Sequence, residues 1–160
     1  SRRQADEYKL IGKQMLADFQ TALGDSRPSV VFLEKKFNLG LGEYLLTGTI
    51  DRVDRLADGT HEIIDYKTGK KPKAFGYANK RQLLLYQAAL EESFHLKVSK
   101  LTFQYLKDGE TVSFVAKPGE LDKVKNDMIG LIEEIRKGVF KRPPHNDCKY
   151  CSHGPVADES

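Results

Sequence analysis

Two aspartates and a lysine near the middle of the chain have the residue types and the spacing to hold a metal ion beside an ammonium group. The run GTIDRVD contains Asp51, and the run DYKTG, which follows the turn ADG at 57–59, contains Asp65 and Lys67. A three-residue hairpin loop with glycine in the left-handed position is common, and it gives a register that pairs Asp51 with Asp65. Because strand residues alternate between faces, Asp65 and Lys67 are neighbours on one face.

Two carboxylates that strand pairing brings together need a cation between them. Directly opposed side chains have Cβ atoms about 4.5–5.5 Å apart, and like charges at this distance destabilise a sheet. Mg²⁺ typically takes one or two protein carboxylates and leaves the rest of its shell to water and substrate phosphate. The Lys67 ammonium would orient a water molecule or stabilise a phosphate under attack. The pattern therefore indicates phosphodiester hydrolysis.

Two alternatives remain at this point. A two-residue loop at 58–59 would shift the pairing by one residue and turn Asp51 to the other face. The charges could also be ordinary solvated groups on an exposed hairpin, since acidic residues are mostly exposed. Against the second alternative, Asp51 and Asp65 each follow apolar strand residues of the kind that lie in a core.

A longer set of motifs is spread in order over residues 31–90. It consists of Glu34, then Gly48-x-x-Asp51-Arg52, then Asp65-Tyr66-Lys67-Thr68, and then Gln82-x-x-x-Tyr86. This ordered set resembles the RecB-type branch of the PD-(D/E)XK nucleases, which occur as C-terminal domains of recombination helicases and as free-standing nucleases. The resemblance implies an α/β (α+β) fold of the restriction-endonuclease-like kind, with a mixed central sheet flanked by helices.

The resemblance also implies roles for the hairpin residues. Asp51 and Asp65 would bind Mg²⁺ or Mn²⁺, and the backbone carbonyl of Tyr66 would add a ligand. Lys67 would be the catalytic lysine. Glu34 is similar to a glutamate that the family places near its active site, where it would hold a metal-bound water; its plain reading is an outward charge on an edge strand.

Further residues are candidates for contact with the substrate. Gln82 and Tyr86 are one helical turn apart and share a face, and in the family this pair lies beside the active site. Basic residues cluster after the hairpin, which favours either a groove that tracks phosphates or a solvated loop; they are Lys67, Lys70, Lys71, Lys73, Lys80 and Arg81. We take Lys70 and Arg81 from this group as substrate-binding candidates. The chain as a whole is only mildly basic, with a net charge of +3.

Hydrophobic periodicity predicts the element order αβββαββα. Apolar residues at helical spacing predict a first helix that ends near Gly24; they are Tyr8, Ile11, Met15 and Phe19. Strands are expected at 30–37, 44–56, 62–67, 98–106 and 111–116, with a helix at 77–94 between the third and the fourth. A closing helix carries one apolar stripe that we predict to be core, formed by Leu121, Val124, Met128, Leu131 and Ile135.

The chain length of 160 residues suits one domain with one core. We predict a nuclease domain at 1–142 and a C-terminal arm at 143–160 that is truncated. The arm contains Cys148 and Cys151, and some RecB-like nucleases use a similar group in a [4Fe–4S] cluster. Such a cluster needs four thiolates, and the chain has two cysteines, so we expect no cluster in this chain alone. A zinc site with His145 and His153, a dithiol and a disulfide remain alternatives, and a vestigial arm is favoured over zinc.

One departure from the family concerns histidine. Enzymes of this branch usually add a metal-binding His from a helix before the first strand, and this chain has no His before His61. The helix was lost with the truncation, or Glu7, Gln14 or Gln20 stands in for the histidine, or the site binds metal weakly. The departure supports an alternative function, a non-catalytic DNA-binding scaffold that keeps the nuclease fold. A CxxC metal-binding interaction domain ranks last because it leaves the hairpin unexplained.

The residues and the resemblance together predict a Mg²⁺- or Mn²⁺-dependent deoxyribonuclease domain. Its partners would be DNA and the helicase domains or subunit of an assembly that works in DNA repair or recombination. The first residues lead into no apolar segment of a signal peptide, and no stretch approaches the ~18 apolar residues that cross a bilayer. We therefore expect a protein without a membrane partner, located in the cytoplasm and associated with the nucleoid.

Overall fold

A computed structural model describes residues 2–139 of the chain. The elements follow the predicted order αβββαββα. They are α1 (Arg2–Leu23), β1 (Ser29–Leu41), β2 (Tyr44–Arg55), β3 (His61–Lys67), α2 (Tyr77–Phe94), β4 (Val98–Tyr105), β5 (Glu110–Phe114) and α3 (Glu120–Arg136). Among these residues, no helix combines the length and the apolar character that crossing a bilayer requires.

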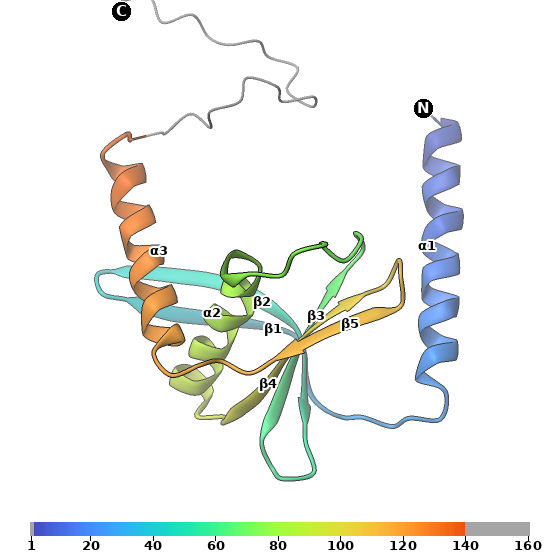
Figure 1. Cartoon of the computed structure of the whole chain (residues 1–160), viewed down its shortest axis with the longest axis horizontal. Coiled ribbons are helices and arrows are strands. Elements are labelled where there is room, and N and C mark those ends of the chain that lie inside the picture. The colour runs from blue at the N-terminus through green and yellow to red at the C-terminus, as the bar shows by residue number, and fades with distance from the viewer. Residues whose placement is uncertain (1, 140–160) are drawn as a thin grey trace, which may run out of the picture.

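The five strands form one mixed sheet in the order β1-β2-β3-β4-β5. Neighbouring strands are antiparallel, except that β3 and β4 are parallel. A parallel pair needs a crossover connection, which is usually a helix, and α2 supplies it here. Figure 1 shows α2 and α3 on one side of the molecule and α1 on the other. The predicted mixed sheet flanked by helices is therefore confirmed.

The core lies between α2 and the face of the sheet that α2 covers. On β3 the alternate residues His61, Ile63 and Asp65 are buried, whereas Ile64 and Tyr66 are only partly buried. Leucines of α2 meet this face and are almost inaccessible to solvent; they are Leu83, Leu84 and Leu90. Fully burying one such side chain contributes about 1.5–3 kcal/mol. The buried face of β3 thus includes Asp65, a carboxylate among apolar neighbours.

The closing helix α3 matches the predicted stripe only in its first half. Val124 is fully buried, and Leu121 and Met128 pack against the core. Leu131 and Ile135, however, are 44% and 54% exposed, so the prediction that they are core is wrong. Ile129 and Ile132, in the same half of α3, pack against the core instead, so the buried side of the helix is not the one on which Leu131 and Ile135 lie.

The first helix forms where it was predicted, but its apolar stripe is not buried. No residue of α1 is buried, and Tyr8 is 70% exposed. The helix ends at Leu23, and Gly24 follows with a φ of +52°, the left-handed conformation in which helices commonly terminate. Near this end the ring of Phe19 meets the ring of Tyr66 edge to face, with centroids 5.6 Å apart.

In both β1 and β2, the alternation of side chains between the two faces of the sheet is interrupted at the same point. Their pairing goes from Leu33–Arg52 directly to Lys35–Ile50, and Glu34 between them has a φ of +48°. A left-handed residue interrupts the alternation of a strand. As a result, Ile50 and Val53 of β2 are both fully buried although they are an odd number of residues apart. Asp51 lies at this irregularity.

Candidate active site

The hairpin between β2 and β3 has the predicted three-residue loop. Gly59 is left-handed with a φ of +82°, and the Leu56 N–H donates to the Thr60 carbonyl over 2.8 Å. The ladder continues from Arg55–His61 to Arg52–Ile64. This register excludes the two-residue loop, and it makes Asp51 and Asp65 the next opposed positions.

Beyond the last backbone pair of β2 and β3, the contact between the two strands is made by the side chain of Asp51. The ladder between β2 and β3 ends at Arg52–Ile64, and beyond it the Tyr66 N–H donates to Oδ2 of Asp51 over 2.9 Å. This bond holds the Asp51 carboxylate against the end of β3. Burial is the main cause of the raised pKa of Asp65, and the negative charge of Asp51 adds a smaller contribution in the same direction.

Asp65 is the most unusual group of the site because it is a carboxylate that is almost completely buried. Its exposure is 2%, and its Oδ1 accepts a hydrogen bond from Gln82 Nε2 over 2.8 Å. Its Oδ2 is buried without a hydrogen-bond partner, although Lys67 Nζ lies 2.6 Å away as an ion-pair partner. Burial raises the pKa of Asp65, and the Lys67 ammonium offsets this only in part.

The Gln82 amide connects the ion pair to α2. Its oxygen accepts from Lys67 Nζ over 2.7 Å, and its nitrogen donates both to Asp65 and to the Tyr86 hydroxyl, the latter over 2.8 Å. Gln82 and Tyr86 therefore share one helix face beside Asp65 and Lys67, where the resemblance places them. The amide has its oxygen toward the cation and its nitrogen toward the anion, which fixes both groups.

The glycine of the GxxD motif makes room for an aromatic support of this network. A Cβ atom at Gly48 would lie 2.7 Å from two ring atoms of Phe37, and the Phe37 ring packs against the Tyr86 ring with centroids 5.5 Å apart. Sequence reasoning did not assign this role to Gly48 or Phe37. The available signal was the glycine itself, since glycine inside a strand often marks a close approach of another group.

A second feature that sequence reasoning missed lies on the other face of β2. Arg52 and Asp54 are 9% and 6% exposed, and they form a bidentate pair with distances of 2.7 and 2.6 Å. The hydrogen bonds that Arg52 donates to the Asp54 carboxylate raise the pKa of Arg52. Arg52 Nη1 also donates to the Tyr66 hydroxyl over 3.0 Å. The spacing of two residues within a strand could have indicated that Arg52 and Asp54 are neighbours.

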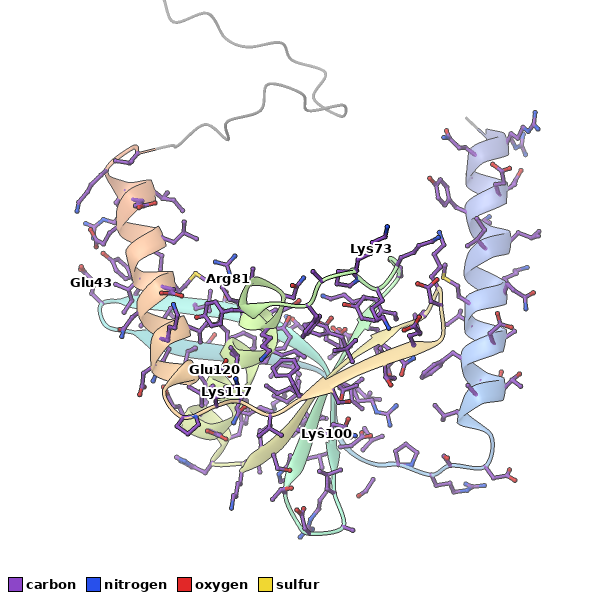
Figure 2. All side chains as sticks on the ribbon, viewed as in Figure 1. Glu43, Lys73, Arg81, Lys100, Lys117 and Glu120 are labelled. Atoms are coloured by element: carbon purple, nitrogen blue, oxygen red, sulfur yellow. The ribbon has the colours of Figure 1, made fainter. Side chains whose placement is uncertain are left out.

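The remaining candidates lie farther from this network. Glu34 is exposed, and its place in the β1–β2 register is opposite Asp51. Lys70 and Arg81 are exposed as well. Figure 2 shows Arg81 on α2 and Lys73 on the segment between β3 and α2, toward the end of the sheet where β3 finishes. Lys71 instead pairs with Glu110. Cys148, Cys151, His145 and His153 lie outside the described residues.

Asp51 and Asp65 are the side chains that could hold a metal ion. Carboxylate oxygens are the ligands that Mg²⁺ prefers, and the Asp65 Oδ2 has a cation, the Lys67 ammonium, as its partner in this structure. Within residues 2–139, no three His, Cys, Asp or Glu side chains gather closely enough to form a larger set of ligands. Such a site would take its other ligands from backbone, water or substrate.

Comparisons with known proteins show what the chain is similar to. Similar curated proteins are the ATP-dependent helicase/deoxyribonuclease subunits B of Streptococcus pyogenes serotype M3 (strain ATCC BAA-595 / MGAS315), serotype M1 and serotype M49 (strain NZ131). Each is 42% identical over 67 residues, which cover 39% of this chain and 6% of the relative. The chain thus spans a small part of the length of these relatives.

A similar solved structure is the crystal structure of SSO0001, with a TM-score of 0.48 and 19% sequence identity, covering 93% of this chain and 75% of that chain. A family model for the PD-(D/E)XK nuclease superfamily matches residues 2–156, which is nearly the whole chain. The resemblance drawn from the sequence motifs is thereby confirmed, and the chain belongs to the PD-(D/E)XK nuclease superfamily.

Proposed function

We propose that this chain is a nuclease module that hydrolyses DNA phosphodiester bonds with Mg²⁺ or Mn²⁺. The observation that carries the proposal is the Asp65 carboxylate, which is 2% exposed and has the Lys67 ammonium 2.6 Å from its Oδ2. This ion pair offsets the cost of burial only in part, so the pKa of Asp65 stays raised. Burying a charge is costly unless it is paired and hydrogen-bonded. A second carboxylate on Asp51 adds repulsion at the same place.

A bound metal ion would offset the repulsion between the carboxylates of Asp51 and Asp65. Asp51 and Asp65 would hold it, and the Tyr66 carbonyl remains our proposed third protein ligand. When bound, the ion polarises the scissile phosphate and lowers the pKa of a coordinated water. Glu34 is proposed to hold a water molecule from its position opposite Asp51 in the strand register.

The protein's own contribution centres on Lys67. Its side chain is 34% exposed, so the ammonium can reach a bound phosphate while Asp65 and Gln82 fix its direction. A positioned cation offsets the negative charge that develops on a phosphate under attack. The Gln82 amide oxygen accepts a hydrogen bond from the Lys67 ammonium and so holds it beside Asp65. The Tyr86 hydroxyl accepts a hydrogen bond from the same amide and holds the amide in place.

Exposed basic residues near the site are proposed to bind the DNA backbone. Lys70, Lys73 and Arg81 follow the end of β3 in the sequence and are exposed. Arginine and lysine contacts to phosphate provide most of the affinity for DNA that does not depend on sequence. The curated relatives are named as subunits of a helicase/deoxyribonuclease, which supports a helicase partner for this chain. A role in DNA repair or recombination remains our proposal.

The second candidate function is a non-catalytic DNA-binding scaffold. Its support is the lack of a histidine before His61, together with the finding that residues 2–139 contain no group of three metal-binding side chains. The two functions differ in whether the phosphodiester bond is broken.

A DNA digestion assay separates the two functions. The wild-type chain, Lys67→Ala and Lys97→Ala are incubated with labelled single- and double-stranded DNA and with MgCl₂ or MnCl₂. Lys97 is an exposed lysine beside the start of β4, at the opposite end of the strands from the site, so it is a matched control. We expect cleavage by the wild type and by Lys97→Ala, and a loss of about a hundredfold or more in Lys67→Ala. Binding of DNA without cleavage by the wild type would favour the scaffold.

A further inference from the structure

Tyr66, the residue between Asp65 and Lys67, is held from three directions. Its N–H donates to Asp51 Oδ2 over 2.9 Å, and its hydroxyl accepts from Arg52 Nη1 over 3.0 Å. Its ring meets the ring of Phe19 from α1. Asp51 and Arg52 are consecutive residues of β2. The Asp51 side chain holds the backbone of Tyr66, and the Arg52 side chain holds the Tyr66 hydroxyl.

These contacts occur where regular strand pairing has stopped. The ladder between β2 and β3 ends at Arg52–Ile64, whereas the ladder between β3 and β4 continues to Lys67–Tyr105. Backbone pairing therefore fixes the end of β3 to β4 and leaves it unpaired on the side of β2. The separation of Asp51 on β2 from Asp65 on β3 depends on the side-chain contacts that cross this gap.

Arg52 is itself held rigidly. Its Nε and Nη2 donate to the two oxygens of Asp54, and both residues are almost completely buried. The guanidinium group is planar, and a bidentate pair fixes its orientation. Because Nε and Nη2 of Arg52 are bound to Asp54, the third nitrogen, Nη1, is left to donate to the Tyr66 hydroxyl.

We propose that Arg52 and Tyr66 are positioning residues, whose hydrogen bond holds the end of β3 at the distance from β2 that the metal site needs. The proposal rests on the proposed function, because it assigns these residues to the same site. Neither side chain is expected to touch the phosphate. A purely structural role would change the stability of the protein without changing how it binds metal.

The test uses Tyr66→Phe, which removes the hydroxyl and keeps the ring that contacts Phe19. The matched control is Tyr44→Phe, because the Tyr44 hydroxyl also accepts a hydrogen bond from an arginine, Arg136, over 2.6 Å, at the opposite end of β2. Binding of Mn²⁺ to each 160-residue chain is followed at one temperature by calorimetric titration with MnCl₂, which gives the half-saturating metal concentration. Loss of a partner that orients metal ligands typically costs 10–100-fold in affinity.

We expect the half-saturating concentration to rise about tenfold or more in Tyr66→Phe and to stay at the wild-type value in Tyr44→Phe. Arg52→Lys, which cannot form the bidentate pair and reach Tyr66 together, should behave like Tyr66→Phe. Equal half-saturation of the wild type and Tyr66→Phe would overturn the proposal while leaving the metal site intact.

A second measurement does not depend on metal. Amide hydrogen exchange at residue 66 reports the bond to Asp51, and we expect faster exchange in metal-free Tyr66→Phe than in the wild type. Unchanged exchange would overturn the positioning role. A wild type that shows no response to MnCl₂ would instead contradict the proposed function, so the two failures are distinguishable.

Discussion

Gly48→Ala tests the packing that supports the site. The new Cβ would lie 2.7 Å from Cε1 and Cζ of Phe37, whereas carbon atoms in contact are about 3.5–4.0 Å apart. The ring must therefore move by roughly 1 Å. Phe37 is 4% exposed and packs against Tyr86, so no free space receives it. Overpacking of this kind typically costs 1–3 kcal/mol, and we expect about that loss in the free energy of unfolding.

The assay for Gly48→Ala is urea denaturation, followed by DNA digestion at a temperature where the variant is folded. Gly40→Ala is the matched control, since Gly40 lies on β1 and a Cβ there would meet nothing within 4 Å. Each kcal/mol should lower the melting temperature by about 2–4 °C. Because the Phe37 ring would press on Tyr86, digestion should fall as well. If Gly48→Ala were as stable and as active as Gly40→Ala, the packing argument would be refuted.

Two further predictions concern the charges of the site. Because burial raises the pKa of Asp65, this group favours the folded state below its ordinary value of 3.8 and loses that contribution as the pH rises through the folded pKa. Metal-free Asp65→Asn should therefore be more stable than the wild type at neutral pH in urea denaturation, with the advantage disappearing below pH 3.8; lower stability at neutral pH would contradict this reasoning. Lys73→Ala and Arg81→Ala test the proposed phosphate contacts. For each variant, we expect the slope of log DNA affinity against log salt concentration, measured by fluorescence anisotropy, to decrease in magnitude by about 0.7–0.9. An unchanged slope would show that the residue does not contact phosphate.

The hairpin could be derived from the sequence because its information is local. A three-residue loop with glycine at the left-handed position gives a register that places Asp51 opposite Asp65, and the structure has this loop rather than the two-residue alternative. The structure adds that the Asp51 side chain, rather than its backbone, makes the next contact with β3. The proximity of Asp65 and Lys67 follows from strand geometry alone, and their ion pair confirms it.

The support around the site could not be derived because it joins segments that are distant in sequence. Phe37 on β1 meets both Gly48 and Tyr86, and no periodicity within one element predicts that meeting. The same limit explains the error for Leu131 and Ile135. Their spacing matches that of buried Val124, but in this half of α3 the residues that pack against the core are Ile129 and Ile132.

Glu34 shows how backbone conformation complicates a prediction based on alternation. A strand that alternates regularly would place Glu34 on the face opposite to Leu33. The φ of +48° at Glu34 interrupts that pattern in β1, and the alternation of faces in the paired strand β2 is interrupted at the same place. A left-handed residue that is not glycine is uncommon and costs of order 1–3 kcal/mol when strained, and here it lies opposite Asp51, beside the proposed metal site.

The central claim is that Asp51 and Asp65 together hold one divalent cation. Calorimetric titration of the metal-free protein with MnCl₂ tests it directly, with Asp51→Asn and Asp65→Asn as test variants. Asp58→Asn is the matched control, because Asp58 is an exposed aspartate in the turn of the same hairpin. We predict one high-affinity site in the wild type and in Asp58→Asn, and its loss in both test variants. Binding that persists unchanged in Asp51→Asn and Asp65→Asn, or that is absent from the wild type, would contradict the claim.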